Sequence, residues 1–176
     1  ATGGFKGRLN PWQVLPCPRD DEEEPEENRL YRDEGYGSDD LAMHLKNLDI
    51  WFGLYLPSLS DMQKATLKRC LVELYAQFRI DWDTDILELE AKDFPVFTDL
   101  YLLLKSRAEE QPGKIVYKEL LNLLYDLVYG ADSFIWNGHS TVASSARFLV
   151  LDTHALQETG ENVQRAQYFL LMLYNW

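Results

Sequence analysis

Residues that could carry out hydrolysis gather in the stretch SFIWNGHSTVASSARFLVLD (Ser133–Asp152). It holds His139 beside Ser140 and ends in Asp152. A serine hydrolase uses these three residue types, with the serine and its histidine base in hydrogen-bond contact. The GxSxG pattern is absent, and neighbouring residues of a strand point to opposite faces. A catalytic triad is therefore disfavoured.

The end of this stretch, FLVLD (Phe148–Asp152), also has the pattern of a Walker B strand, whose aspartate holds Mg²⁺ through water. Thr153 stands where a catalytic glutamate usually follows. A P-loop does not precede it: the nearest candidate is Gly113-Lys114, where Ala108 replaces the first glycine and Ile115 replaces the Ser or Thr. We therefore expect a buried strand that ends at a turn.

Two metal-binding patterns are incomplete. DWDTDILELEAK (Asp81–Lys92) begins like a calcium loop, but Ile86 takes the place of its glycine and Lys92 that of its bidentate glutamate. It is more typical of a solvated turn between helices, anchored by Trp82. The spacing typical of zinc ligands is also absent among the three histidines, which are His44, His139 and His154. No metal ligand, catalytic residue or cofactor-binding residue is assigned.

Composition narrows the class of protein. The 176 residues are 46% hydrophobic and suffice for one domain with a real core. The formal charge is −12, and seven acids lie in DDEEEPEE (Asp20–Glu27), which favours a solvated loop. Because no basic stripe is visible, direct nucleic-acid binding is not expected. Cys17 and Cys70 have no CxxC spacing, and no signal peptide or membrane span is visible, so a cytoplasmic chain with reduced thiols is predicted.

Helical periodicity dominates the middle of the chain. The apolar spacing predicts helices at about 39–56, from Ser60 to about 78, 99–110, 115–129 and from about 160 to the end. Ser60-Asp-Met-Gln63 is a capping-box pattern, Thr98 is the expected cap of the third helix, and Gly130 is the expected residue after the fourth. The Leu and Tyr stripes are expected to face the core.

Short strands are expected around this helical part. The pattern predicts a hairpin or two short strands at Phe134–Trp136 and Phe148–Leu151, with turn chemistry at Asn137-Gly138. Residues 1–18 predict an extended arm with strand character near Leu9 and Trp12–Leu15. The predicted fold class is α+β and predominantly α: a helical bundle with a few short strands.

Four segments together resemble one family. They are GGFKGRLNPWQV (Gly3–Val14), the stretch Asp21–Leu67, DFPVFTDLYLLL (Asp93–Leu104), and YGADSFIWNGHSTVASSARFLVLDTHAL from Tyr129 onward. They look like parts of the large type IV secretion ATPases: the fourth VirB protein and its TraC- and TrwK-like relatives, especially the conjugative-transposon branch. The resemblance covers essentially the whole chain and rests on the order and spacing of these segments.

The resemblance implies a RecA-like P-loop ATPase with a helical insertion, and this chain as a fragment between its Walker A and Walker B motifs. It implies three parts: an arm and acidic loop (1–38), a helical subdomain (39–130), and short strands plus a helix of the ATPase core (131–176). Asn10-Pro11 and Arg147 match family positions, without an assigned contact to ATP. The beginning at ATGG and the end in an apolar helical pattern also suggest a piece of a larger protein.

By the same resemblance, the parent binds ATP and Mg²⁺, forms a hexamer, and works with other subunits of a secretion or conjugation machine at the inner face of the bacterial membrane. Membrane association is expected only through partners. Both Walker motifs are missing here, so the fragment itself is expected to be an inactive module that docks partners, covers the nucleotide cleft or transmits hinge motion. Two alternatives stay open: an independent helical adaptor, and a subdomain of a DNA-translocating motor.

Overall fold

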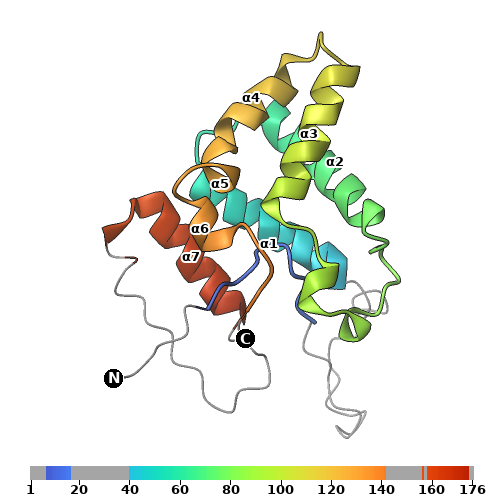
Figure 1. Ribbon diagram of the computed structural model, residues 1–176, viewed down its shortest axis with the longest axis vertical. Helices are drawn as coiled ribbons and strands as arrows, with labels where there is room; N and C mark the ends of the chain where they lie inside the picture. Colours follow the sequence, from blue (N-terminus) through green and yellow to red (C-terminus); the bar gives the residue numbers. More distant parts are fainter. Residues whose placement is uncertain (1–6, 17–39, 142–155, 157, 175–176) are drawn as a thin grey trace, which may run out of the picture.

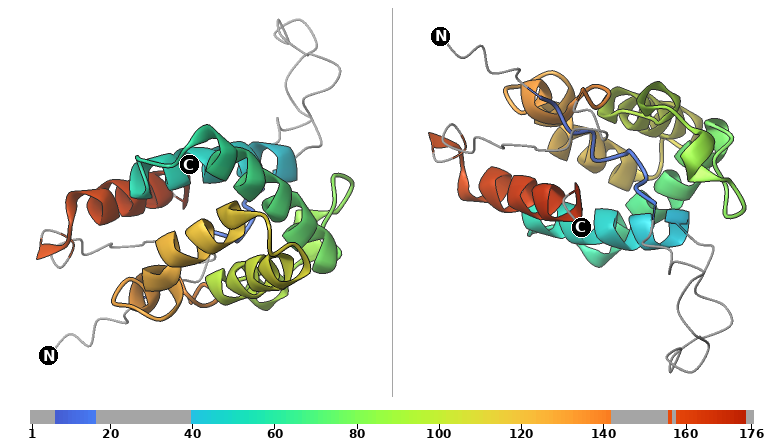
Figure 2. Two further views of the ribbon diagram at one scale, coloured as in Figure 1. Left: turned by 90° about the horizontal axis from the view of Figure 1, so that it is seen from above. Right: turned by 90° about the horizontal axis from the view of Figure 1, so that it is seen from below.

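The computed structural model describes residues 7–16, 40–141, 156 and 158–174, and within them it consists of helices in two layers (Figures 1 and 2). One layer holds α1 (Asp40–Tyr55), α2 (Asp61–Gln77) and α7 (Glu161–Tyr174). The other holds α3 (Phe97–Glu110), α4 (Ile115–Leu123), α5 (Tyr125–Val128) and α6 (Ser133–Trp136). Two 3₁₀ turns, η2 (Ile86–Glu88) and η3 (Ala91–Asp93), join α2 to α3. The predominantly helical fold class is confirmed.

The capping box at the start of α2 is present as predicted. The Gln63 N–H donates to Ser60 Oγ at 3.2 Å, and the Ser60 N–H donates to Gln63 Oε1 at 3.0 Å. These two bonds satisfy backbone groups that the first turn leaves free. Along α2 the predicted apolar face is buried, including Leu67, Leu71 and Leu74.

Helix α3 begins at Phe97, one residue before its predicted cap, Thr98. Asp99, in the first turn, accepts the Val96 N–H at 2.8 Å. Thr98 is inside the helix, and its own N–H donates to Asn137 Oδ1 at 3.1 Å. A side chain 39 positions away thus supplies the cap that local sequence was expected to supply.

The predicted strand at Phe134–Trp136 is wrong, because these residues form α6 and no strand occurs among the described residues. A single helical turn is closed by the Asn137 N–H, which donates to Ser133 O at 3.0 Å. It directs Trp136 into the core and leaves Phe134 82% exposed. The second half of the predicted hairpin, Phe148–Leu151, lies outside the described residues.

The predicted helix over 115–129 is interrupted at Leu124. Its backbone there has φ −93° and ψ 1°, and the Leu127 N–H bonds back only three residues, to Leu124 O at 3.1 Å. The chain continues as the short α5, and Leu120, Leu124 and Leu127 all remain in the core.

One aromatic core lies between the two layers. Trp51 stands edge-on to Phe52 and Trp136 at centroid distances of 5.1 and 4.9 Å, and Phe97 lies 5.5 Å from Trp51. Trp12, from the arm, joins the same cluster at 5.0 Å from Phe97. All three predicted parts of the chain therefore contribute side chains to one core. The division into three parts stays a prediction.

Cys70 is buried in this core, and burial raises its thiol pKa to about 11. The thiol is therefore protonated at neutral pH and packs as a small apolar group. None of the described helices is both long enough and apolar enough to span a bilayer.

Arg79, just after α2, has a left-handed backbone conformation with φ 60°. The Ile80 N–H donates to Tyr75 O at 3.0 Å across this turn, an arrangement that glycine favours. Arg79→Gly should therefore raise the free energy of unfolding by about 1 kcal/mol. Ala65→Gly, at an exposed position inside α2, should lower it by about 1 kcal/mol. Urea unfolding measures both changes in the free energy of unfolding. Two changes of the same sign would contradict the left-handed conformation of Arg79.

Candidate functional site

Three of the segments that carry the family resemblance meet at one place in the fold. Residues 7–16, which we call the strap, pass between the two helical layers (Figure 2, right). The strap contacts the start of α3 at Pro95 and the segment after α6 at Ser140 and Thr141. We call these contacts the junction. Residues more than 80 positions apart in sequence are joined there.

The strap pairs with the segment that follows α6. The Arg8 N–H donates to Thr141 Oγ1 at 2.8 Å, and the Thr141 N–H returns a bond to Arg8 O at 2.9 Å. The Asn10 N–H donates to Ser140 Oγ at 2.9 Å. Gly138 lies against this pair with φ +155°, and a Cβ there would collide with the Arg8 guanidinium. The expected strand near Leu9 is instead an irregular extended segment.

Asn10 connects the strap to α3. It is buried, its Nδ2 donates to Pro95 O at 2.8 Å, and its Oδ1 accepts the Trp12 N–H at 3.2 Å. Asn137 completes the connection, because its Nδ2 donates to Thr98 Oγ1 at 2.9 Å. Both asparagines satisfy backbone or hydroxyl groups that the fold would otherwise bury without a partner. These bonds give Asn10, whose role the sequence left open, a structural role.

A buried chain of hydrogen bonds leads from the strap to α1. The Tyr75 hydroxyl donates to Trp12 O at 2.7 Å, since a carbonyl oxygen can only accept. His44 Nε2 lies 2.9 Å from the same hydroxyl oxygen. Because Tyr75 has used its one proton, His44 must donate, which places the proton of the neutral ring on Nε2. Sequence reasoning missed this arrangement, because three different elements supply its members.

Burial lowers the pKa of His44 from 6.5 to about 3. The unfolded chain thus binds the proton more readily than the folded chain at pH 3–6.5. The contribution of His44 to the free energy of unfolding should therefore be complete above pH 6.5, and it should decrease as the pH falls from 6.5 towards 3. Between pH 7 and pH 5 we expect a loss of about 2 kcal/mol from this group.

The control is His44→Gln, whose side-chain amide can still donate to Tyr75. Urea unfolding at pH 7, 6 and 5 should show a smaller decrease for the variant than for the unchanged chain. Identical pH dependence would mean that His44 is not the titrating group.

The hydrolase candidates are not assembled as a triad among the described residues. His139 is exposed, and Ser140 Oγ accepts the Asn10 N–H. His44 is buried with Tyr75. Asp152, His154 and Arg147 lie outside the described residues, as do Cys17 and the acidic run. Ser140 therefore has a structural contact where a nucleophile was considered.

The calcium-like segment is a turn between helices, as expected. Asp81 Oδ1 accepts the Asp83 N–H at 3.1 Å and the Thr84 hydroxyl at 2.9 Å, and Asp85 Oδ1 accepts the Leu87 N–H at 3.1 Å. These carboxylates cap local backbone. No group of carboxylates, histidines and cysteines in the described part of the chain could hold a metal ion. Trp82 is 46% exposed, so the anchors of this segment are Ile80 and Ile86 instead.

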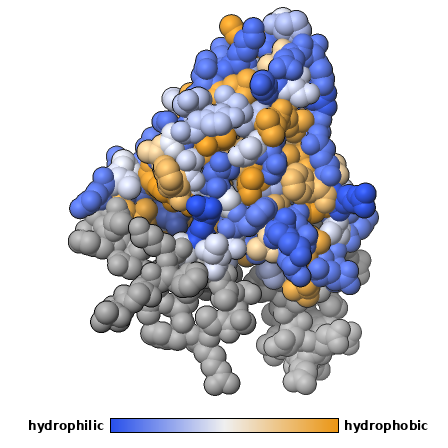
Figure 3. Space-filling view, in the orientation of Figure 1, coloured by the Kyte–Doolittle hydropathy of each residue, from blue (hydrophilic) through white to orange (hydrophobic). Residues whose placement is uncertain are grey.

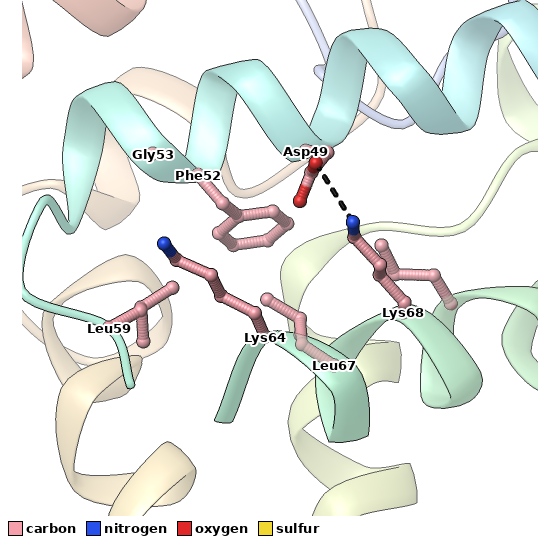
Figure 4. A pocket seen from close by; sticks show the side chains of 8 residues that line it. Asp49, Phe52, Gly53, Leu59, Lys64, Leu67 and Lys68 are labelled. Atoms are coloured by element: carbon pink, nitrogen blue, oxygen red, sulfur yellow. Dashed lines mark ion pairs between the residues drawn. The ribbon is translucent and has the colours of Figure 1, made fainter. Parts of the chain in front are cut away.

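A hollow between α1 and α2 is too small for a nucleotide (Figure 4). Its cavity volume is about 10 Å³, which admits about one water molecule. Lys68 Nζ pairs with Asp49 Oδ2 at 3.0 Å across its mouth, and both side chains are about half exposed. Such a surface pair contributes little stability. The hollow is lined by Phe52, Gly53, Leu59, Lys64, Leu67 and Leu71.

Exposed aromatic side chains gather on the other layer. Tyr129 stands edge-on to Tyr101 at 5.3 Å and lies 5.4 Å from Tyr125. Tyr125 and Tyr129 are more than half exposed. On the face shown in Figure 3, apolar residues alternate with polar ones instead of forming a continuous apolar surface. Most of the predicted apolar stripes are buried, whereas Tyr125 and Tyr129 are exposed.

These features define a helical domain whose two layers are joined by a strap, and no group of metal ligands occurs among its described residues. No family model matches the chain, and no curated protein matches it. Among solved structures, the chain is similar to VirB4 of Thermoanaerobacter pseudethanolicus, with 35% sequence identity and a TM-score of 0.80. The match covers 97% of this chain and 40% of that chain. It confirms the resemblance to the type IV secretion ATPases that the sequence segments indicated, and the chain corresponds to part of such a protein.

Proposed function

We propose that this chain is the helical subdomain of an ATPase that energises type IV secretion or conjugative DNA transfer. The observation that carries the proposal is the 35% identity to VirB4 over nearly the whole chain. Since the chain spans 40% of that protein, the residues that bind ATP and Mg²⁺ are assigned to the remainder of the parent. The helical subdomain docks partner proteins or covers the nucleotide cleft.

Phosphoryl transfer needs a phosphate cradle, Mg²⁺ ligands and a positioned water. Several described carboxylates instead cap turns or pair with basic side chains, as Glu73 does with Arg107 between α2 and α3. Carboxylates that stabilise the fold in this way favour a non-catalytic role for the chain. The complete protein is proposed to act as a hexamer with other subunits of the secretion or conjugation machine, at the cytoplasmic face of the membrane.

Titration of Mg·ATP into the isolated chain should give no saturable heat of binding. The expectation rests on the small hollow between α1 and α2 and on the missing P-loop. Isothermal titration calorimetry checks it, with the complete protein as the positive control. Saturable binding by the isolated chain would overturn the proposed non-catalytic role.

An independent helical adaptor is the second candidate. It is favoured by the exposed Tyr125 and Tyr129, which pack with the half-buried Tyr101. Tyrosines supply large contact areas at interfaces. The parent reading frame separates the two candidates. A P-loop before Ala1 and an apolar-Asp-Glu run soon after Trp176 would support the ATPase, whereas a reading frame without them would support the adaptor.

A further inference from the structure

Unsatisfied polar atoms concentrate in the strap. Four buried side-chain nitrogen or oxygen atoms in the described residues have no hydrogen-bond partner, and three of them are Arg8 Nε, Trp12 Nε1 and Gln13 Oε1. The fourth is Trp51 Nε1 in α1. Each such atom costs on the order of 1–3 kcal/mol relative to its hydrated state. Ten residues thus hold most of the unsatisfied groups, so docking of the strap is opposed by its own polar atoms.

Apolar burial favours docking of the same segment. Leu9, Trp12 and Val14 are all less than 5% exposed, and Trp12 touches rings from three helices. Those rings are Phe52 of α1, Tyr75 of α2 and Phe97 of α3. Two contributions of opposite sign therefore act on the strap, and its net docking free energy is smaller than apolar burial alone would give.

The strap has few regular backbone bonds to resist opening. It belongs to no helix, and among the described residues its backbone bonds to the rest of the fold are those to Ser140, Thr141 and the Tyr75 hydroxyl. Segments with irregular backbone and little regular hydrogen bonding open with free energies below that of global unfolding. In contrast, α2 is a regular helix of 17 residues whose apolar face is buried, including Leu67, Leu71 and Leu74.

We propose that the strap is a releasable connector, which leaves the helical layers by local opening while α1, α2 and α3 stay folded. Its release separates Trp12 from three helices at once and breaks the pairing with Thr141. While the strap is docked, movement of the chain at the junction is transmitted to the helical layers, and release of the strap ends this coupling. This role in transmitting motion rests on the proposed function, whereas the local opening itself does not.

Amide hydrogen exchange of the isolated chain, followed by NMR at several urea concentrations, tests the opening. The reporters are the amides of Asn10 and Thr141, which donate across the junction to Ser140 Oγ and Arg8 O. The references are Leu71 and Leu74 inside α2. We expect protection at the reporters to be at least tenfold lower than at the references, and nearly independent of urea. Reporters that share the protection and the urea dependence of the α2 amides would overturn the proposal.

Thr141→Val provides a matched perturbation, because it removes the acceptor of the Arg8 N–H and keeps the backbone bond to Arg8 O. It should speed exchange at the Asn10 amide several-fold without changing Leu71. Thr84→Val, in the turn after α2, is the control and should leave the Asn10 amide unchanged. Equal effects of both variants on Asn10 would contradict the proposal. The experiment uses no nucleotide, so a negative result leaves the ATPase assignment intact, and loss of that assignment leaves the opening measurable.

Discussion

Trp12→Ala should lower the free energy of unfolding by about 3–5 kcal/mol, the range for truncation of a fully buried large aromatic side chain. Trp12 is 0% exposed and contacts rings on α1, α2 and α3. Its removal leaves a cavity between the two layers that the surrounding helices can fill only in part. Equilibrium urea unfolding, followed by far-ultraviolet circular dichroism, measures the loss.

Trp82→Ala is the control for this prediction, because the same change is made at a side chain that is 46% exposed. We expect a loss of less than about 1 kcal/mol there. If Trp12→Ala cost no more than Trp82→Ala, the strap would not be an integral part of the core in solution, and the description of the junction would be wrong.

Tyr75→Phe should lower the free energy of unfolding by roughly 2–4 kcal/mol, although it removes a single oxygen atom. The Tyr75 hydroxyl serves two buried groups: it donates to Trp12 O and accepts from His44 Nε2. The phenylalanine ring leaves both without a partner in a site from which water is excluded, at about 1–3 kcal/mol each. The same urea experiment measures the effect.

Tyr125→Phe makes the identical chemical change on the surface and should alter stability by less than about 0.5 kcal/mol. The double variant Tyr75→Phe with His44→Phe should cost less than the sum of the two single variants, because the two side chains share one interaction. Strict additivity would show that the hydrogen bond between them contributes nothing.

Local sequence predicted the long helices well, since their signals are contained within a few turns. Leucine spacing located α1 and α2, and the Ser60 capping box marked the start of α2. The same local signals failed at Phe134–Trp136. Its aromatic and β-branched residues favour a strand, but the burial of Trp136 against Trp51 and Tyr55 selects a helical turn.

The junction could not be predicted from the sequence, because its partners are far apart along the chain. Asn10 bonds to Pro95 and Ser140, and nothing in NPW or HST indicates that these segments meet. The order of the segments did indicate the family, which the similarity to VirB4 confirms. Sequence resemblance thus located the parts, and only the structure shows that they support one another.

The proposed function makes this chain a non-catalytic part of an ATPase. Steady-state ATP hydrolysis, measured side by side for the isolated chain and for the complete product of its reading frame, is the decisive measurement. We expect Mg²⁺-dependent turnover by the complete protein and only background hydrolysis by the chain. Sustained turnover by the isolated chain, or none by the folded complete protein, would contradict it.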